Sequence, residues 1–194
     1  MIARLRPLEP SEWSEEVRRL LGAAPVSDGD TVGGTQGGKD GPPNILRTIA
    51  YHPHLLRPCL GFAAALAING VLRRRDSELL ALRAAWNCQS NFEWGHHVVF
   101  ALAAGLDEAE IGRIAIGPSD AAWPPNDRLL LQAADDLHHD QRISDDTWRG
   151  LREEFNEAQL VEIPFVVGNY TMLSMVANST GVPLEDGLPG LPLR

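Results

Sequence analysis

Apolar residues recur at intervals of three and four along most of this chain, which is the spacing of one face of an α-helix. The clearest stripe lies in the segment NDRLLLQAADDLHHD and consists of Leu129, Leu130, Ala133, Ala134 and Leu137. No segment alternates between apolar and polar residues for long enough to indicate a β-strand. The pattern therefore predicts an all-α domain, built as a helical bundle.

Proline and glycine stop helices, and a Ser or Asp before an apolar run begins them. Asp76, Asp107 and Ser144 are the expected N-caps, and Asn69 with Gly70 is an expected stop. The helices that these signals predict cover residues 11–21, 44–53, 54–70, 77–87, 94–105, 108–117, 126–140, 145–155 and 158–179.

Composition predicts how the domain is organised. Residues 1–41 comprise an N-terminal helix and a flexible arm, because the segment SDGDTVGGTQGGKDGPP is rich in glycine and nearly free of large apolar residues. Residues 42–181 form the helical domain, and residues 182–194 form a Pro/Gly-rich tail that we expect on the surface. An arm this long is unusual in a compact domain, so we expect it to cover something, such as a neighbouring subunit.

Composition and charge narrow the classes of function. The 194 residues suffice for one compact domain with an ordinary core, since 44% are hydrophobic and 22% are charged. A net charge of -9 repels phosphate backbones, which disfavours nucleic acid as a partner. Lys39 is the only lysine and lies in the arm, so a Schiff-base mechanism is not expected.

The cysteines and the apolar runs bear on where the protein works. Cys59 and Cys88 are the only cysteines, too few for a disulfide framework, which fits a reducing compartment. No charged and apolar leader opens the chain, and no uninterrupted apolar run reaches the ~18 residues of a membrane span. We therefore expect a cytoplasmic protein that is neither exported nor embedded in a membrane.

The segment NCQSNFEWGHH concentrates the candidate chemistry. A helix turns about 100° per residue, so Ser90, Glu93 and His97 share one face within an arc of about 60°. Trp94 lies about 40° to the other side of that face, whereas His96 is turned about 120° away. His97 is therefore the better candidate for a shared pocket.

A simpler interpretation of the same residues is structural. Ser90 and Glu93 also form an S-x-x-E capping box, in which the serine hydroxyl and the glutamate carboxylate each accept from the other's backbone amide. Both interpretations stay open at this point. The segment carries many polar side chains directly before the apolar run VVFALAAG, and this favours a function beyond capping.

A turn near residues 87–89 would bring a second carboxylate to this face. In one straight helix Glu78 and His97 would be about 28 Å apart, beyond any contact. If the chain turns there, the two arms form an antiparallel hairpin that places Glu78 and His97 at similar heights. Glu78, Glu93 and His97 could then meet at one site.

The pattern of Glu78, eleven further residues, then Ser90-x-x-Glu93-x-x-x-His97, followed by GLDEAEI, resembles the carboxymuconolactone decarboxylase family. This all-α family also contains the alkylhydroperoxidase D proteins. The resemblance covers roughly residues 42–181, although only the central motif is specific. It implies a central antiparallel helix hairpin and assembly into dimers, trimers or hexamers, with sites near subunit contacts.

The chain departs from the peroxidase branch of that family at its two cysteines, where it has Ser90 and Glu93. A dithiol peroxidase needs a low-pKa thiolate and a second, resolving thiol. Neither replacement supplies these. Cys88 lies about 160° from the direction of Ser90 and is expected to be a packed, inert thiol.

Acid–base chemistry is what the remaining residues support. Burial raises the pKa of a glutamate and a nearby imidazolium lowers it, so Glu93 and His97 could exchange protons near neutral pH. We predict a cofactor-free, metal-free decarboxylase or lyase acting on a small organic acid or lactone, with Glu78, Ser90, Glu93 and His97 as catalytic residues. Candidates for binding the substrate are Trp94 and the guanidinium of Arg83 or Arg47.

Other hypotheses stay open on the sequence alone. Cys88 could act as a lone peroxidatic thiol in an alkylhydroperoxidase-type antioxidant. The pairs Glu93-x-x-His96 and Asp135-x-x-His138 have the spacing of carboxylate metal sites in helical bundles. The fold could also serve as a non-catalytic oligomeric binding module.

Overall fold

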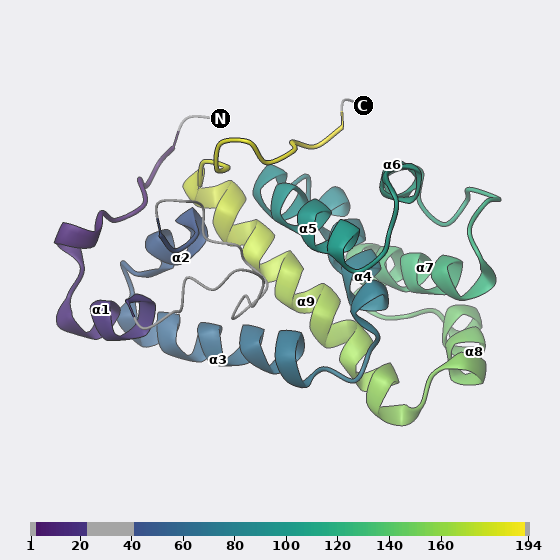
Figure 1. Ribbon diagram of the computed structural model, residues 1–194. Coiled ribbons are helices and arrows are strands. Elements are labelled where there is room, and N and C mark those ends of the chain that lie inside the picture. The colour runs from purple at the N-terminus through teal and green to yellow at the C-terminus, as the bar shows by residue number, and fades with distance from the viewer. Residues whose placement is uncertain (1–2, 23–40, 193–194) are drawn as a thin grey trace.

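The computed structural model describes residues 3–22 and 41–192, and in these residues the only regular secondary structure is helical (Figure 1). The prediction of an all-α fold is confirmed. A short 3-10 turn, η1 (Pro10–Glu12), precedes the helices α1 (Glu15–Leu21), α2 (Asn44–Ile49), α3 (Pro53–Asn69), α4 (Arg74–Asn87), α5 (Asn91–Ala103), α6 (Glu108–Ile116), α7 (Pro125–Asp140), α8 (Asp145–Glu154) and α9 (Glu157–Thr180).

Helix α4 is the centre of the bundle. It packs against α5, α6, α7 and α9, and every residue from Asp76 to Ala85 is buried. Apolar residues on all sides of the helix fill the core, while the polar ones must find partners on neighbouring helices. Figure 1 shows α9 lying diagonally across the molecule, with α3 on one side and α5 on the other.

The chain turns sharply between α4 and α5. Gln89 adopts a left-handed conformation with φ of 51°, and the backbone amide of Ser90 donates to the carbonyl of Ala85 at 2.9 Å. Helix α5 begins directly afterwards with Ser90 as its N-cap, and it packs back against α4. The turn expected near residues 87–89 is therefore confirmed, and with it the helix hairpin.

The start of α4 differs from the prediction. The helix begins at Arg74, so Asp76 lies inside the first turn and is not the N-cap. Its carboxylate accepts from Nε and Nη2 of Arg73 at 2.7 and 2.8 Å. An acidic residue is favoured at either position by the partial positive charge of a helix N-terminus, so the sequence signal is the same for both.

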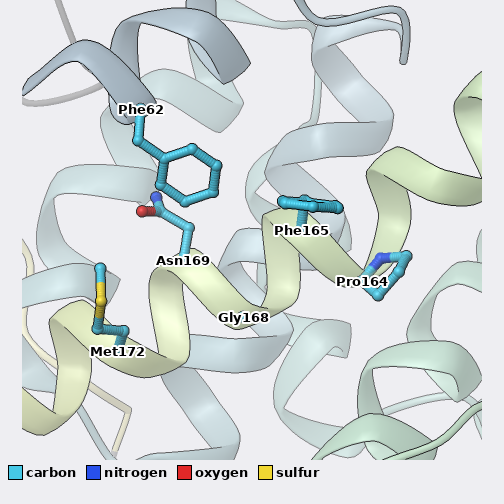
Figure 2. A pocket seen from close by; sticks show the side chains of 6 residues that line it. All are labelled: Phe62, Pro164, Phe165, Gly168, Asn169 and Met172. Carbon is cyan, nitrogen blue, oxygen red and sulfur yellow. The ribbon is translucent and has the colours of Figure 1, made fainter. Parts of the chain in front are cut away.

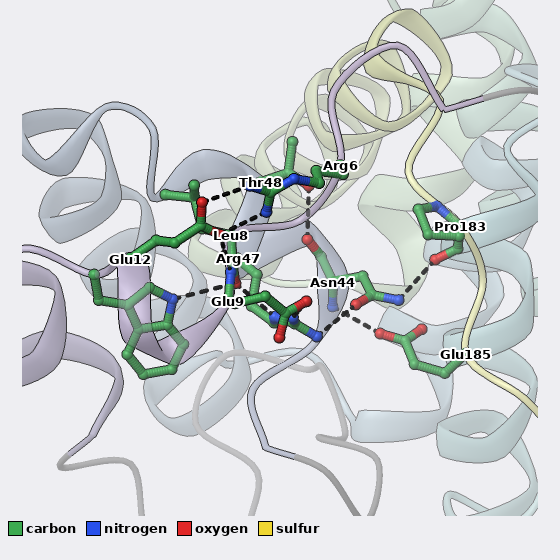
Figure 3. A network of polar contacts seen from close by, with 10 residues as sticks. Arg6, Leu8, Glu9, Glu12, Asn44, Arg47, Thr48, Pro183 and Glu185 are labelled. Atoms are coloured by element: carbon green, nitrogen blue, oxygen red, sulfur yellow. Dashed lines mark hydrogen bonds and ion pairs between the residues drawn. The ribbon is translucent and has the colours of Figure 1, made fainter.

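The N-terminal segment, α2 and the tail are tied together by hydrogen bonds (Figure 3). Arg47 donates to the carbonyl of Leu8 at 2.9 Å, and the backbone amide of Asn44 donates to Glu185 of the tail at 2.7 Å. The tail is thus fixed against the domain. The predicted arm falls on residues 23–40, which lie outside the described residues.

Helix α9 is long and apolar enough to span a membrane by length and composition. Half of the relevant window is nevertheless buried inside the domain, which is how the central helix of a folded bundle behaves.

Candidate active site

The hairpin brings together residues of α4 and α5 that are far apart in the sequence. Oε2 of Glu78 lies 2.6 Å from Nδ1 of His97, although 19 positions separate the two residues. Ser90, Glu93 and His97 are fully buried, and Glu78 is 1% exposed. The predicted set of Glu78, Ser90, Glu93 and His97 therefore forms one buried cluster, while its role in catalysis stays a prediction.

Arg74 completes this cluster at its outer end and was missed from the sequence. Its Nη2 lies 2.7 Å from Oε1 of Glu78, and its guanidinium lies over the ring of Phe100 with Cζ 5.6 Å from the ring centre. This ion pair fixes the Glu78 carboxyl group from the side opposite His97. Arg74 and Glu78 are four positions apart, a spacing typical of helical ion pairs, but this signal depends on α4 starting at residue 74.

Glu93 is the unusual member of the cluster, because neither of its carboxyl oxygens has a hydrogen-bond partner among the described residues. Its Oε2 lies 3.7 Å from Nε2 of His97, too far for a hydrogen bond. Burial raises the pKa of Glu93 to about 8, and the negative charge of Glu185 adds to this effect. At neutral pH Glu93 is therefore a neutral carboxylic acid.

His97 is oriented between the two carboxyl groups. Nδ1 faces a carboxyl oxygen of Glu78, which favours the tautomer that donates from Nδ1 and leaves Nε2 as an acceptor. Nε2 has no hydrogen-bond partner among the described residues and is the ring nitrogen nearer Glu93. The ring is held edge-on by Tyr170 and Phe100, at centroid distances of 4.2 and 5.6 Å. A proton can thus pass between Glu93 and His97 after a small approach.

The rings of Tyr170 and Phe100 shield the pair of Glu93 and His97 from water. Tyr170 is 5% exposed, and burial, followed by the negative charges of Glu78 and Glu93, raises the pKa of its hydroxyl. The phenol therefore stays neutral at physiological pH. In such a low-dielectric surrounding, the electrostatic interactions among Glu78, Glu93 and His97 are stronger than they would be in water.

The capping interpretation accounts for only part of the motif. Oγ of Ser90 accepts from the backbone amide of Glu93 at 3.3 Å, as in a capping box. The reciprocal bond is absent from this turn, since the Glu93 carboxyl has no hydrogen-bond partner within residues 3–22 and 41–192 and the amide of Ser90 donates to Ala85. Ser90 is a helix cap, and Glu93 is not explained by capping.

The residues predicted to hold the substrate are used inside the fold. Arg83 donates from Nε and Nη2 to both carboxylate oxygens of Asp135, at 2.6 and 2.8 Å, and from Nη1 to the carbonyl of Ile114 at 2.7 Å. It therefore points toward α6 and α7 and away from Glu93. Arg47 holds the N-terminal segment. Trp94 is buried, with its ring 5.9 Å from that of Trp86 in α4.

The two cysteines lack the features of reactive thiols. Cys59 and Cys88 are free and half-buried, and burial raises the pKa of each thiol. Hydrogen bonds with Thr171 and Ser174 offset part of this effect at Cys88, and the negative charge of Glu93 raises the pKa of both thiols wherever that residue is ionised. Cys88 is also the C-cap of α4, where the helix dipole disfavours an anion. A peroxidatic thiolate is not favoured at either position.

The predicted metal pairs do not converge. Nε2 of His96 lies 2.7 Å from Glu185 of the tail, and Asp135 is occupied by Arg83 and by the side-chain amide of Asn87. Among residues 3–22 and 41–192, no cluster of His, Cys, Asp and Glu is arranged to hold a metal ion.

Comparison with known proteins agrees with the geometry of the hairpin. Residues 53–136 match the model of the carboxymuconolactone decarboxylase family, a range that contains α3, the hairpin and the whole cluster. No match was found among curated proteins.

Several solved structures share the fold. An uncharacterized peroxidase-related protein from Ralstonia eutropha, described as an alkylhydroperoxidase AhpD core, is 18% identical, with a TM-score of 0.78 over 96% of this chain and 94% of its own. A variant of the debrominase Bmp8 in complex with 2,3,4-tribromopyrrole is 13% identical, with a TM-score of 0.72 over 96% and 94%. A protein of unknown function from Agrobacterium tumefaciens is 19% identical, with a TM-score of 0.66 over 71% and 94%. At these identities the likeness establishes the fold alone.

Proposed function

We propose that this chain, which belongs to the carboxymuconolactone decarboxylase family through residues 53–136, is a cofactor-free acid–base enzyme that decarboxylates a small organic acid or lactone. The observation that carries the proposal is the state of Glu93. It is a fully buried, neutral carboxyl group with no hydrogen-bond partner among the described residues, 3.7 Å from an imidazole that Glu78 orients. A folded protein rarely leaves such a group unsatisfied without a functional reason.

The proposed reaction uses Glu93 as the proton donor. As the substrate's carbon–carbon bond breaks and carbon dioxide leaves, the electron pair passes into the adjacent conjugated carbonyl to give an enolate. Glu93 then donates its proton to the carbon that lost the carboxylate, forming the new C–H bond. Each turnover therefore consumes one proton, which returns from water to Glu93 through Nε2 of His97.

Glu78 and Arg74 act as positioning residues in this scheme. Glu78 holds His97 so that Nε2 remains directed to Glu93, and it stabilises the imidazolium that forms when His97 carries the proton. Arg74 holds the Glu78 carboxyl group in place through its 2.7 Å ion pair. The side chain of Arg74 is 38% exposed, so it can also attract an anionic substrate toward the cluster.

The size of the substrate follows from the closure of the site. Glu93 and His97 are fully buried, so the substrate must be small and must displace part of the wall on entry. A neighbour of this fold that binds 2,3,4-tribromopyrrole supports a small ring as the kind of molecule that fits.

The same closure favours a second candidate, a non-catalytic oligomeric module in which the cluster is internal structure. A peroxidase reaction at Cys88, as the names of peroxidase-related neighbours suggest, is disfavoured by its raised pKa.

The test is turnover of a panel of small lactones and 3-keto acids, followed by mass spectrometry and carbon dioxide release. We expect Glu93→Gln and His97→Asn to lower kcat by about 10²-fold or more, the usual contribution of a general acid. Cys88→Ser and the surface control Glu153→Gln should leave kcat unchanged. Because the donor is lost when Glu93 ionises, activity should fall as pH rises through about 8. No turnover of any panel member would favour the module, and peroxide consumption lost in Cys88→Ser would favour the redox enzyme.

A further inference from the structure

The described part of the C-terminal tail, residues 182–192, lies on α5 and is fixed to the domain at two points. At the first point, Oε2 of Glu185 lies 2.7 Å from Nε2 of His96. Oε1 of the same carboxylate accepts from the backbone amide of Asn44 at 2.7 Å (Figure 3). At the second point, the backbone amide of Leu191 donates to Oδ1 of Asn91 at 2.9 Å. Glu185 thus joins the tail to both α2 and α5.

The contact of Glu185 with His96 lies beside Glu93, the proposed proton donor. Glu93 and His96 are three positions apart on α5, which places their side chains about 60° apart around the helix. Glu185 is also near enough for its negative charge to raise the pKa of Glu93. Glu93 and His96 are buried, whereas the side chain of Glu185 is 15% exposed. The tail therefore lies between solvent and this side of the cluster.

The tail is the wall of the cluster that can move at the lowest cost. It contains no helix, so its release breaks no helical hydrogen bonds. Among residues 183–192, only the partly buried Leu184 and Leu191 pack against the core. The helices α4 and α9, in contrast, supply much of that core. Segments with few buried apolar contacts and few backbone hydrogen bonds open locally at a small fraction of the cost of unfolding.

The surroundings of Glu185 are those of a site for a small carboxylate. A ring nitrogen of His96 and the backbone amide of Asn44 face its two oxygens, and both donors are fixed by the helices that carry them. No arginine among residues 3–22 and 41–192 forms an ion pair with Glu185. A second carboxylate can therefore replace that of Glu185 on the same two donors without burying any additional charge.

We propose that the tail is a lid held closed by Glu185, whose carboxylate occupies the position that a small carboxylate ligand takes when the lid opens. The ligand then accepts the hydrogen bonds from His96 and Asn44, Glu185 moves into solvent, and the bond between Leu191 and Asn91 is lost with it. The closed state is autoinhibited, because the chain supplies its own competitor for the site. Only the identification of this ligand with the substrate rests on the proposed function; the exchange of carboxylates does not.

The apolar groove between α3 and α9 is a different opening and does not suit a carboxylate (Figure 2). It is lined by Phe62, Pro164, Phe165, Gly168, Asn169 and Met172. None of these side chains is charged, and only Asn169 is polar. A carboxylate would lose its water there without a cation or enough donors in return. Met172, 44% exposed in this groove, therefore provides a control position.

The first test uses acetate as the probe and needs no substrate. The ring nitrogens of His96 are followed by NMR while sodium acetate replaces sodium chloride at constant ionic strength. Acetate should bind to Glu185→Ala at least about tenfold more tightly than to the wild type, because the tethered carboxylate competes at an effective concentration on the order of millimolar. Asp186→Ala removes the neighbouring, exposed carboxylate of the same tail. This matched control and Met172→Ala should bind acetate as the wild type does.

Hydrogen exchange shows whether the lid opens in the unaltered chain, and it decides the question if Glu185→Ala does not fold. Acetate should accelerate exchange of the Leu191 amide by about tenfold, while the Asn44 amide, which then donates to acetate, stays protected. Unfolding would expose both amides.

Equal acetate affinities in wild type and Glu185→Ala, no acetate binding to a folded Glu185→Ala, or an unchanged exchange rate at Leu191 would each overturn the lid. If acetate opens the lid as expected but no lactone or keto acid is turned over, the lid stands and the proposed decarboxylase is lost.

Discussion

Two clusters of ionisable side chains lie on different sides of α4, one fully buried and one partly buried at Asp135, and they are built in opposite ways. The cluster of Arg83 and Asp135 uses every strong donor and acceptor it has, through a two-bond ion pair and a carbonyl of α6. In the part of the chain that the structure describes, the cluster of Glu78, Glu93 and His97 leaves four polar atoms without a hydrogen bond: both oxygens of Glu93, Nε2 of His97 and Oε1 of Glu78, of which the last has an ion pair with Arg74. About 140° of helix rotation separates Arg83 from Glu78.

The number of unsatisfied polar atoms distinguishes the two clusters better than burial or charge does. Both clusters are ionisable, and the side chains of Arg83 and Asp135 are only 10% and 14% exposed, so charge and low exposure alone would not select one cluster. A satisfied ion pair holds helices together, whereas unsatisfied lone pairs are destabilising and are kept where chemistry needs them. Stability should therefore depend on the first cluster and be reduced by the second.

The largest expected effect is the loss of one partner from the satisfied pair. Arg83→Met leaves Asp135 partly buried without its cation, which should lower the free energy of unfolding by about 3–5 kcal/mol. Urea unfolding followed by circular dichroism measures this change. The double variant Arg83→Met with Asp135→Leu should recover much of the loss, because no isolated charge then remains. A single variant as stable as the wild type would remove the contrast between the clusters.

Replacing Glu93 is expected to raise the free energy of unfolding at neutral pH, opposite to the effect of replacing Arg83. Its folded-state pKa of about 8 exceeds the ordinary value of 4.5, so the folded protein holds a proton that the unfolded chain releases as pH rises. Stability should therefore decline between these values, by about 3 kcal/mol from about pH 5 to about pH 7.5. Glu93→Gln cannot ionise and should abolish this decline, making the variant the more stable protein at about pH 7.5.

Thermal unfolding of wild type and Glu93→Gln at both pH values tests that reversal. The difference between the two proteins cancels titrations elsewhere in the chain. Glu153→Gln, an exposed substitution of the same type, provides the control and should shift neither curve. If Glu93→Gln were equally destabilising at both pH values, Glu93 would be ionised in the folded protein, and the proposed proton donor would be lost.

The smallest effect is expected at Ser90, which lies beside Glu93 and His97 and also caps α5 through its hydrogen bond. Ser90→Ala should cost about 1 kcal/mol of stability, the ordinary contribution of an N-cap. Ser144→Ala, which removes the N-cap of α8, is the matched comparison. Equal losses would identify Ser90 as a cap alone, and a further tenfold loss of turnover only in Ser90→Ala would assign it a part in the reaction.

The sequence was sufficient for the hairpin because its signals are local. Helical spacing places Ser90, Glu93 and His97 on one face, and the break at residues 87–89 folds Glu78 back toward them. The boundaries of α6 and α8 were predicted within about one residue, since Asp107 and Ser144 cap them. Caps and periodicity act over one or two turns, which a single sequence displays directly.

The partners that come from distant segments could not be predicted in this way. Arg83 was expected at the substrate, yet it binds Asp135, 52 positions away. Glu185 of the tail pairs with His96 across 89 positions and contributes to the raised pKa of Glu93. Whether a guanidinium or carboxylate has an ion-pair partner depends on which helices become neighbours. The spacing of residues along the sequence does not show this.

The tail packs so closely on α5 that the residues allowed at positions 95 and 184 depend on each other. A methyl group at Gly95 would lie 2.7 Å from Leu184 and 2.8 Å from the carbonyl of Pro189, so the helix tolerates no side chain while the tail lies there. Homologues that carry alanine or serine at position 95 should therefore have a smaller residue at 184 or a differently routed carboxyl end. A substitution at position 95 or 184 should therefore be accepted in evolution only together with a compensating change at the other end of this contact.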